Sequence, residues 1–262
     1  MIDILGKKFS LSDTQHYTLS IRFLPDGFCF AILDEAGKVI RFSQYERSQS
    51  LSDIECLQRD FQTVLLCCDS DQYTLLPQNI FQEKDIPLYW KLNFGANTTE
   101  ELHYNEIRLI NVTNLFSVDK NVVSEVTRLF PTVQLTHRQS IHINHCVRRN
   151  KQDGGKQLFV YMNNKSFDVV LVENGSLLLA NTYCYHNEDE FLYFVLNVFD
   201  QLKLDQYHID TIIGGTTESD SKMEKLRKYV KNILLDDGEE ETEQNFLHSQ
   251  EFLLQRHWIS LS

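Results

Sequence analysis

The sequence predicts an α/β protein made of two copies of one β-β-β-α-β-α unit, with mixed sheets flanked by helices. Residues 17–45 and 158–185 both read as three short strands joined by tight turns. A helical pattern and a buried apolar strand follow each of these segments. Self-similarity at a spacing of about 140 residues predicts that the chain contains an internal duplication.

In the first copy, the expected strands are YTLSIRF, FCFAILD and IRFSQY, separated by the turns PDG and EAGKV. The middle strand is apolar on both faces, which is typical of a strand covered on both sides. A helix is expected over SDIECLQRDF, because Ser52 and Glu55 have the spacing of a capping box. TVLLCC then reads as a buried strand.

The second copy begins with LFVYMNNKSFDVVLV, followed by the turn ENG and the strand SLLLANTYCY. A helix is expected to start between Asn187 and Glu190, then a buried strand IDTIIGG, and then a helix over DSKMEKLRKYVKNIL. The two copies align at four apolar strand positions, which are Leu19 with Leu158, Ile21 with Val160, Phe28 with Phe167 and Ile32 with Leu171.

The segment between the copies reads as a strand NEIRLINVT, a helix VDKNVVSEVTRLF, a strand TVQLTH and a helix RQSIHINHCVRRN. The polar stretch KQDGGKQ is the best interdomain linker. We therefore expect an N-terminal half with the bridging segment over residues 1–150 and a C-terminal half over residues 151–262. The acidic run DDGEEETEQ, residues 236–244, is interpreted as a solvated loop.

The composition narrows the classes of partner and the cellular compartment that we expect for this protein. With 25 basic and 37 acidic residues the net charge is −12, which disfavours nucleic acid or an anionic membrane as a partner. No secretory signal and no apolar run long enough to span a bilayer is evident, so we expect a cytoplasmic protein. The six cysteines form no CxxC motif and lie mostly in apolar runs, as buried free thiols do.

The order of these elements resembles the actin-like ATPase superfamily, whose halves are ribonuclease H-like, and within it the cell-division and pilus-assembly branch. IDTIIGGTTESDSKMEKL is similar to its adenosine motif, and FPTVQLTHRQSIHINHCV to the segment that enters its second half. YTLLPQNIF and KLNF, at residues 73–81 and 91–94, resemble more closely an uncharacterised bacterial family, a domain of unknown function with an actin-like fold. This resemblance spans nearly the whole chain and implies a fold without implying an activity.

Such relatives hold Mg²⁺ through carboxylates and bind phosphates with the backbone N–H groups of two glycine-rich hairpins. The first hairpin here has Arg22 where an acid would help, Pro25 without an N–H, and Gly27 as its one glycine. In the second hairpin Tyr161 replaces the acid, and three residues replace the glycines, namely Asn163, Asn164 and Lys165. We interpret both phosphate loops as degraded.

Candidates for nucleotide contact remain near the second hairpin. Gly214 and Gly215 end a strand as the adenosine motif does, while Ser166 and Asp168 match a hydroxyl and an acid of the relatives. If a nucleotide binds, Gly214, Gly215 and Ser166 would contact it, with ATP and Mg²⁺ as the cofactors; otherwise none is expected.

Other enzyme chemistry has weaker support in the sequence. A two-metal nuclease needs converging carboxylates, which Arg22 and Tyr161 do not supply. The histidine-rich segment THRQSIHINHC lacks a second cluster to complete a metal site, so its histidines are interpreted as packing or surface residues. No catalytic residue and no metal ligand is nominated, although Asp69 and Asp71 are the place to look for a catalytic carboxylate.

The leading hypothesis is a non-catalytic interaction protein whose cleft between the halves binds a protein partner or a small ligand. A divergent ATP-binding protein is the first alternative, and a small-molecule or sugar-kinase-like enzyme of the same superfamily is the second. The sequence names neither the partner nor the oligomeric state.

Overall fold

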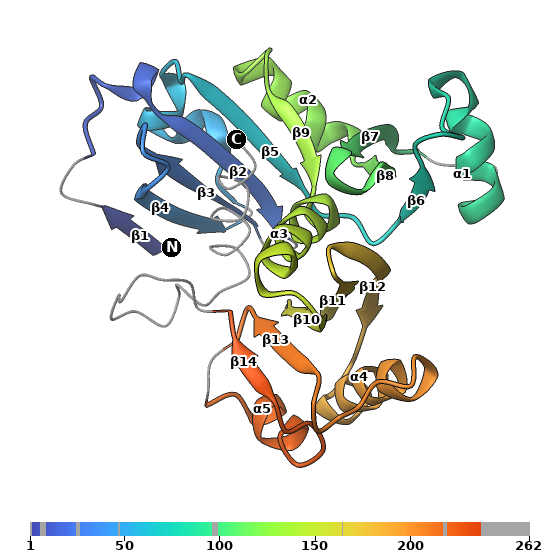
Figure 1. Ribbon diagram of the computed structural model, residues 1–262. Coiled ribbons are helices and arrows are strands. Elements are labelled where there is room, and N and C mark those ends of the chain that lie inside the picture. Colours follow the sequence, from blue (N-terminus) through green and yellow to red (C-terminus); the bar gives the residue numbers. More distant parts are fainter. Residues whose placement is uncertain are drawn as a thin grey trace. The chain divides into compact units, whose positions relative to one another are not determined.

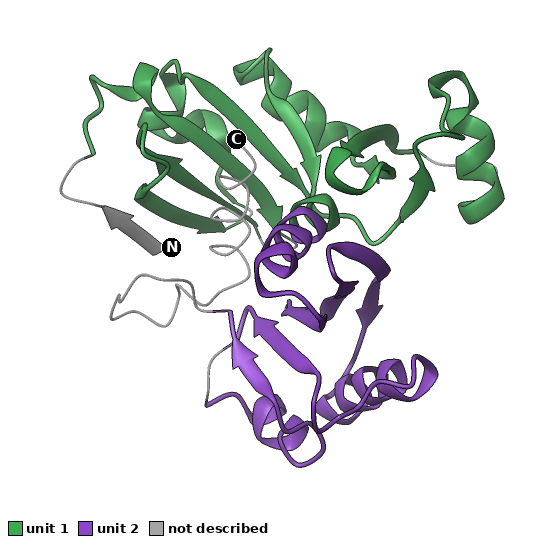
Figure 2. Ribbon diagram, in the orientation of Figure 1, with its two compact units in different colours: residues 1–141, 262 green, residues 142–261 purple. Residues whose placement is uncertain are grey.

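The structure is a computed structural model. It describes residues 2–5, 9–24, 27–46, 48–95, 99–163, 165–216 and 219–236. The chain divides between Ile141 and His142 into two compact units (Figure 2). This division lies inside a helix, nine residues before the junction at residues 150 and 151 that the sequence suggests.

Unit 1 contains a six-stranded sheet with the order β1-β4-β3-β2-β5-β9 (Figure 1). Its strands are β1 (Ile2–Leu5), β2 (Thr18–Leu24), β3 (Gly27–Leu33), β4 (Val39–Glu46), β5 (Thr63–Cys68) and β9 (Gln134–His137). Strands β2, β3 and β4 pair antiparallel, whereas β5 runs parallel to β2 and β9 parallel to β5. The strands expected over residues 17–45, and in TVLLCC and TVQLTH, are confirmed.

Unit 2 repeats this topology in a five-stranded sheet with the order β12-β11-β10-β13-β14. Its strands are β10 (Lys156–Met162), β11 (Ser166–Glu173), β12 (Ser176–Cys184), β13 (Asp210–Gly214) and β14 (Ile233–Leu235). The first three pair antiparallel, and β13 and β14 are parallel additions next to β10. The register shifts after Ile32 in β3 and after Leu171 in β11, at the aligned position of both copies, which supports the duplication.

The α-helices are α1 (Ile86–Phe94), α2 (Lys120–Leu129), α3 (Arg138–Asp153), α4 (Glu188–Gln201) and α5 (Ser221–Leu226). Helix α4 begins as expected, because the Asn187 side chain accepts hydrogen bonds from the N–H groups of Asp189 and Glu190. Gly154 and Gly155, both at positive φ, make the whole connection between α3 and β10. No helix in the described ranges is long and apolar enough to cross a membrane.

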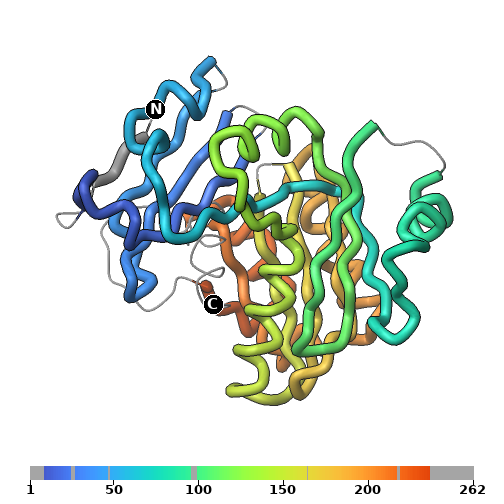
Figure 3. Tube along the Cα trace, turned by 90° about the horizontal axis from the view of Figure 1, so that it is seen from above, coloured from blue at the N-terminus to red at the C-terminus, as the bar shows by residue number. Residues whose placement is uncertain are grey.

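Unit 1 also carries a three-stranded sheet that we did not expect from the sequence, with the order β6-β8-β7. It consists of β6 (Tyr73–Pro77), β7 (Glu101–Ile107) and β8 (Val112–Val118), and Figures 1 and 3 both place α1 beside β6. The single strand expected over NEIRLINVT is wrong. The chain turns inside it through a 3₁₀ segment, Arg108–Ile110, and a left-handed Asn111 with φ of 54°.

The helix expected over SDIECLQRDF is also wrong. Two short 3₁₀ turns, Leu51–Asp53 and Glu55–Gln58, replace it, and the capping box lies two residues earlier, between Ser50 and Asp53. Ile54 between the turns is extended, and it is buried together with Leu51, Cys56 and Leu57. An α-helix would place Cys56 on the side opposite Ile54, so one stripe could not bury both, and the segment folds as a tighter, irregular layer.

A third correction concerns DSKMEKLRKYVKNIL. Helix α5 ends at Leu226, and Ile233 lies in strand β14, where it pairs with Thr211 of β13. The pairing with a parallel neighbour outweighs the helical spacing of Ile233, as tertiary contacts often do. The acidic run expected as a loop lies outside the described residues beyond Asp236.

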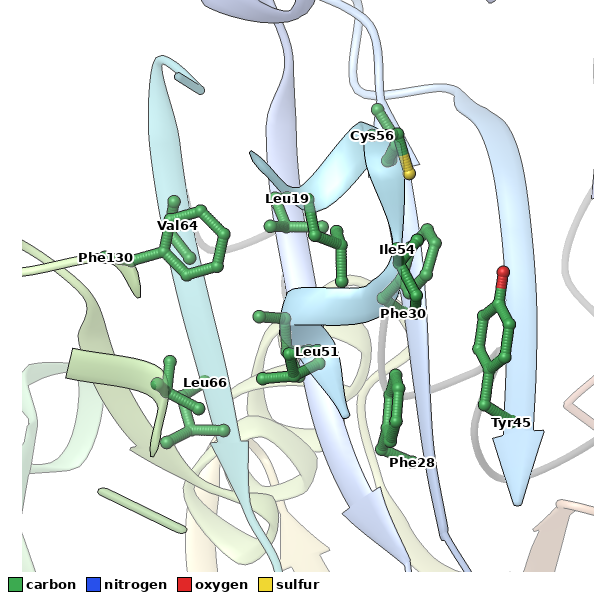
Figure 4. Packing of buried hydrophobic residues seen from close by; sticks show 14 of the residues in the cluster. Leu19, Phe28, Phe30, Tyr45, Leu51, Ile54, Cys56, Val64, Leu66 and Phe130 are labelled. Atoms are coloured by element: carbon green, nitrogen blue, oxygen red, sulfur yellow. The ribbon is translucent and has the colours of Figure 1, made fainter. Parts of the chain in front are cut away.

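Each unit has its own hydrophobic core. In unit 1 the side chains of β2, β3 and β5 face the 3₁₀ layer, so that Leu19, Phe30 and Leu66 pack near Leu51 and Ile54 (Figure 4). In unit 2 the inward faces of β10, β11 and β13 pack against α4 and α5. Further 3₁₀ turns at Thr14–His16 and Glu83–Asp85 complete the described elements.

Candidate functional site

The carboxyl ends of parallel strands are the usual ligand sites of α/β sheets. In unit 1 this edge is formed by β2, β5 and β9, and in unit 2 by β10, β13 and β14. The residues that the sequence singled out, Arg22 and Asp69 in unit 1 and Tyr161 and Gly214 in unit 2, lie at these two edges.

At the edge of unit 1, Asp69 is held between two buried arginines. Arg22 is fully buried on β2, and its Nη2 donates to Asp69 Oδ2 at 2.5 Å. Arg138, 2% exposed at the start of α3, contacts the other carboxylate oxygen through Nη1 and approaches Asp71 Oδ1 at 3.5 Å through Nη2. Two guanidinium groups therefore balance the charge of Asp69 and fix its position.

A buried histidine fixes the loop that follows β5. Nδ1 of His137 accepts from the Asn114 amide at 3.1 Å and from the Gln139 N–H at 3.2 Å. The ring proton therefore lies on Nε2, which donates to the Ser70 carbonyl at 2.8 Å. Asn114 also donates to Ser140 Oγ at 2.9 Å. The sequence analysis interpreted His137 as a packing or surface residue. In the structure its side chain bonds both the loop after β5, at the Ser70 carbonyl, and the start of α3, at the Gln139 N–H.

Next to Asp69 there is a cavity of about 360 Å³ within unit 1. Four of its lining side chains are carboxylates, Asp69, Asp71, Glu100 and Asp119, and none of the described residues that line it is basic. Its apolar walls come from Phe23, Val118 and Val122. We call this space the acidic cavity.

The glycine of the first hairpin has a structural explanation. A Cβ atom on Gly27 would lie 1.9 Å from the carbonyl oxygen of Tyr45 on the neighbouring strand β4. Only glycine allows this close approach of two strands. Pro25, which the sequence analysis also discussed, lies outside the described residues.

At the edge of unit 2, Tyr161 is fully buried, and its hydroxyl donates to Asp236 Oδ2 at 2.8 Å. The same carboxylate, 6% exposed, contacts Arg149 Nη1 at 3.0 Å and His145 Nε2 at 3.3 Å. Burial and the negative charge of Asp236 raise the pKa of Tyr161 well above its usual value. Burial likewise raises the pKa of the Cys146 thiol, which donates to the Tyr161 oxygen at 3.8 Å.

A second buried pair lies directly behind this tyrosine. His142 and Asp168 are 0% and 1% exposed, and His142 Nδ1 lies 3.1 Å from Asp168 Oδ2. Thr182 on β12 donates to the other oxygen of Asp168 at 2.6 Å. The His142 ring stacks on Tyr161, with ring centroids 4.1 Å apart. Asp168, which matches an acid of the relatives, is thus part of an internal network.

The three residues predicted for nucleotide contact lie at the same edge of the unit 2 sheet. Gly214 pairs with Tyr161, and Gly215 follows it at φ 76°, a conformation that favours glycine. Ser166 begins β11, is 8% exposed, and its carbonyl accepts the Asn163 N–H at 2.8 Å across the hairpin. Asn164 lies outside the described residues. Whether these residues contact a nucleotide stays a prediction.

The histidines and acids do not assemble into a metal centre. Within the described ranges no group of three or more His, Cys, Asp or Glu side chains is arranged to hold a metal ion. His142 and His145 share one side of α3, as their spacing predicts, but they bind different carboxylates, Asp168 and Asp236.

Sequence reasoning missed Arg138 and Asp236 as members of these clusters. Arg138 directly follows β9, at the carboxyl edge where ligands and charges gather, and this position was the available signal. Asp236 was taken as part of an acidic loop, because nothing in the local sequence shows that β14 brings it next to Tyr161.

The two larger sheets share the order of five strands, β4-β3-β2-β5-β9 and β12-β11-β10-β13-β14, and each contains an antiparallel hairpin, as in an actin-like ATPase fold. A Bacteroides thetaiotaomicron protein with an actin-like ATPase fold and unknown function is similar to it, with a TM-score of 0.80, 20% identity, and coverage of 95% of this chain and 98% of that one. A PilM–PilN type IV pilus biogenesis complex is similar with a TM-score of 0.63 and 7% identity, over 93% of this chain and 98% of the other.

The chain belongs to the DUF3822 family, a family of proteins of unknown function, which matches residues 6–233. The suspected membership in an actin-like family of unknown function is thereby confirmed. No curated protein matches the chain.

Proposed function

We propose that this protein is a non-catalytic member of the actin-like fold that acts by binding a protein partner, and that its two phosphate hairpins have become structural. One observation carries the proposal. The two strand positions where the relatives' chemistry calls for an acid, Arg22 and Tyr161, are fully buried, and each is bonded to a carboxylate of its own unit.

These bonds use the groups that a phosphate site would need. Arg22 neutralises Asp69 instead of holding a metal-bound water, and Gly27 serves the close approach of Tyr45. In the second hairpin, the Asn163 N–H donates to the Ser166 carbonyl at 2.8 Å. A backbone N–H that closes a hairpin is not free to bind an anion.

The charge near the first hairpin also argues against a phosphate site. The acidic cavity lies at the carboxyl end of β5, and the part of its lining that the structure describes includes four carboxylates and no basic residue. Such a wall repels the oxygens of a triphosphate. The similar PilM structure is described as a complex with PilN, and from it we take the expectation of a protein partner. We expect this role in the cytoplasm.

A divergent ATP-binding protein is the second candidate. The observation in its favour is that Gly214, Gly215 and Ser166 lie at one edge of the unit 2 sheet. A kinase-like enzyme has less support, because Asp69, the nearest candidate for a general base, has both oxygens bound by arginines.

Thermal unfolding with and without millimolar Mg-ATP, Mg-ADP and a non-hydrolysable analogue separates these functions. A ligand at 100 times its dissociation constant adds about 2.7 kcal/mol to the free energy of unfolding, which raises the melting temperature of a chain this size by several degrees. We expect no nucleotide-specific rise. A rise that Ser166→Ala or Gly215→Ala abolishes would overturn the proposal in favour of ATP binding.

A further inference from the structure

Helix α1 of unit 1 is apolar on two opposite sides. Its inner side carries Trp90, which is 3% exposed, and the half-buried Ile86 and Phe94, one turn away in each direction. Leu88 and Leu92 lie two residues before and after Trp90, so that at about 100° per residue they point away from it. They are 53% and 74% exposed, which makes Leu92 the most exposed large apolar side chain in the described part of the chain. A helix that is apolar all round is normally covered on both sides.

Ile80 adds to this exposed apolar surface. The Tyr89 hydroxyl on α1 donates to the Ile80 carbonyl at 2.6 Å, which holds Ile80 beside the helix. The side chain of Ile80 is 53% exposed. We call Ile80, Leu88 and Leu92 the α1 patch. In Figures 1 and 3 helix α1 lies at the margin of unit 1 next to β6, and no described element of this unit covers its outer side.

The charges beside the α1 patch differ between the two ends of the helix. The 3₁₀ turn before α1 carries Glu83, Lys84 and Asp85, so that two carboxylates and one ammonium group leave it net negative. The last turn of α1 carries Lys91. Within the described ranges none of these four side chains forms an ion pair. The arrangement is self-complementary, because an antiparallel copy of the helix brings its lysine to the acidic turn, and the two helix dipoles then attract each other.

A second copy of the chain fits the α1 patch in both respects. When two α1 helices pack antiparallel about a twofold axis, Leu88 and Leu92 of each copy cover those of the other. Lys91 of each copy then faces Glu83 at the start of the other helix, so that each attraction occurs twice. A surface that matches itself in charge and in apolar area meets the requirement of an isologous interface.

We propose that the chain forms a homodimer through antiparallel packing of two α1 patches. The patch includes neither Arg22 nor Tyr161, so the dimer is independent of the proposed function. Helix α1 has nine residues and is about 13.5 Å long. It therefore buries much less than the roughly 800 Å² per partner of a standard interface. We expect a weak dimer with a dissociation constant on the order of 100 µM.

Sedimentation equilibrium of the full chain measures the dimer directly. We expect mostly monomer at about 5 µM and mostly dimer at about 500 µM. Leu92→Glu places a charge in the α1 patch and should raise the dissociation constant at least about thirtyfold. Leu178→Glu is the matched control, because Leu178 is 49% exposed on β12 of unit 2, and it should leave the dissociation constant unchanged. A chain that stays monomeric up to about 500 µM, or a dimer that Leu92→Glu does not weaken, overturns the proposal.

Charge reversal tests the antiparallel arrangement. Lys91→Glu and Glu83→Lys each place like charges in contact at both ends of the dimer, so each variant alone should dimerise about tenfold more weakly. In an equimolar mixture of the two variants opposite charges meet again at both ends, and a dissociation constant within about threefold of the original is expected. The substituted positions are exposed, so the melting temperatures of the variants should match that of the original chain. A mixture that associates no better than either variant alone contradicts the antiparallel pairing.

Discussion

Replacing Tyr161 by phenylalanine removes one hydroxyl group from the interior of unit 2 and keeps the ring that stacks on His142. The hydroxyl donates to Asp236 Oδ2 at 2.8 Å, and that carboxylate is 6% exposed. Water therefore cannot easily replace the lost donor. Arg149 and His145 still contact Asp236 in this variant, at 3.0 and 3.3 Å.

The expected cost follows from the kind of bond that is lost. A hydrogen bond to a charged group contributes about 1.5–3 kcal/mol, against about 1 kcal/mol for a neutral one. We expect Tyr161→Phe to lower the free energy of unfolding by about 2 kcal/mol, because the acceptor is a buried carboxylate. Tyr185→Phe is the matched control, since its hydroxyl donates to the neutral Asn163 carbonyl at 3.0 Å.

Urea unfolding followed by circular dichroism gives the free energies, and hydrogen exchange of the β10 and β13 amides reports unit 2 separately. The double variant Tyr161→Phe with Asp236→Asn closes a mutant cycle and isolates the coupling between the two side chains. If Tyr161→Phe costs no more than Tyr185→Phe, or the cycle shows no coupling, then the Tyr161 bond does not hold unit 2 as we argue.

The pH dependence of the free energy of unfolding is a second test of the Tyr161–Asp236 hydrogen bond. Because the pKa of Tyr161 is raised in the folded chain, its contribution is fully present below the unfolded value of about 10. It is lost as the pH rises from there through the folded pKa, because the unfolded tyrosine releases its proton first. In Tyr161→Phe this part of the alkaline decline should disappear, and in Tyr185→Phe it should persist.

Three further outcomes are expected. Arg22→Leu leaves Asp69 with one arginine and should cost about 2–4 kcal/mol in urea unfolding, whereas adding Asp69→Leu should recover part of that loss rather than add to it. Gly27→Ala places a Cβ against the Tyr45 carbonyl and should destabilise the chain strongly. Gly154→Ala is the control, because nothing lies within 4 Å of its added Cβ, and it should cost only about 1 kcal/mol for its positive φ. The melting temperatures of the two variants are compared. Cys184 is exposed and the other five cysteines are buried, so iodoacetamide should modify Cys184 first in a mass-spectrometric time course, with equal rates at Cys184 and Cys146 contradicting the structure.

The sequence predicted the hairpins of both units because their signals are local. Tight turns with Gly37 and Gly175 separate runs of alternating side chains, and the aligned positions of the copies share their register shifts. Helix α4 was equally accessible, since Asn187 and an amphipathic stripe mark it without reference to the rest of the chain.

The elements that the sequence predicted wrongly, and the charge clusters that it missed, depend on contacts between distant segments. The segment around Ile54 has helical capping signals but buries too many side chains for one stripe, and Ile233 has helical spacing but pairs with β13. The charge clusters were out of reach for the same reason, because Asp69 is 47 residues from Arg22 and Asp236 is 75 residues from Tyr161. Only the sheet topology brings these partners together, and local propensity does not encode it.

Arg22 and Tyr161 occupy equivalent places in the two copies, on β2 and β10, each beside a parallel strand at its carboxyl end. Both are buried polar side chains, and burial of a polar group is costly unless it is bonded. Unit 1 meets this requirement with an arginine and a carboxylate from the loop after β5, and unit 2 with a tyrosine and a carboxylate from the end of β14. The two networks use different residue types and different charges, and their carboxylates follow different strands, β5 in unit 1 and β14 in unit 2. Neither network is therefore a copy of the other. Two unrelated networks at one structural position are expected when that position must be filled to hold the sheet edge, and they are not expected when a single ligand is shared by both halves. This difference is why we assign Arg22 and Tyr161 to the stability of their own units.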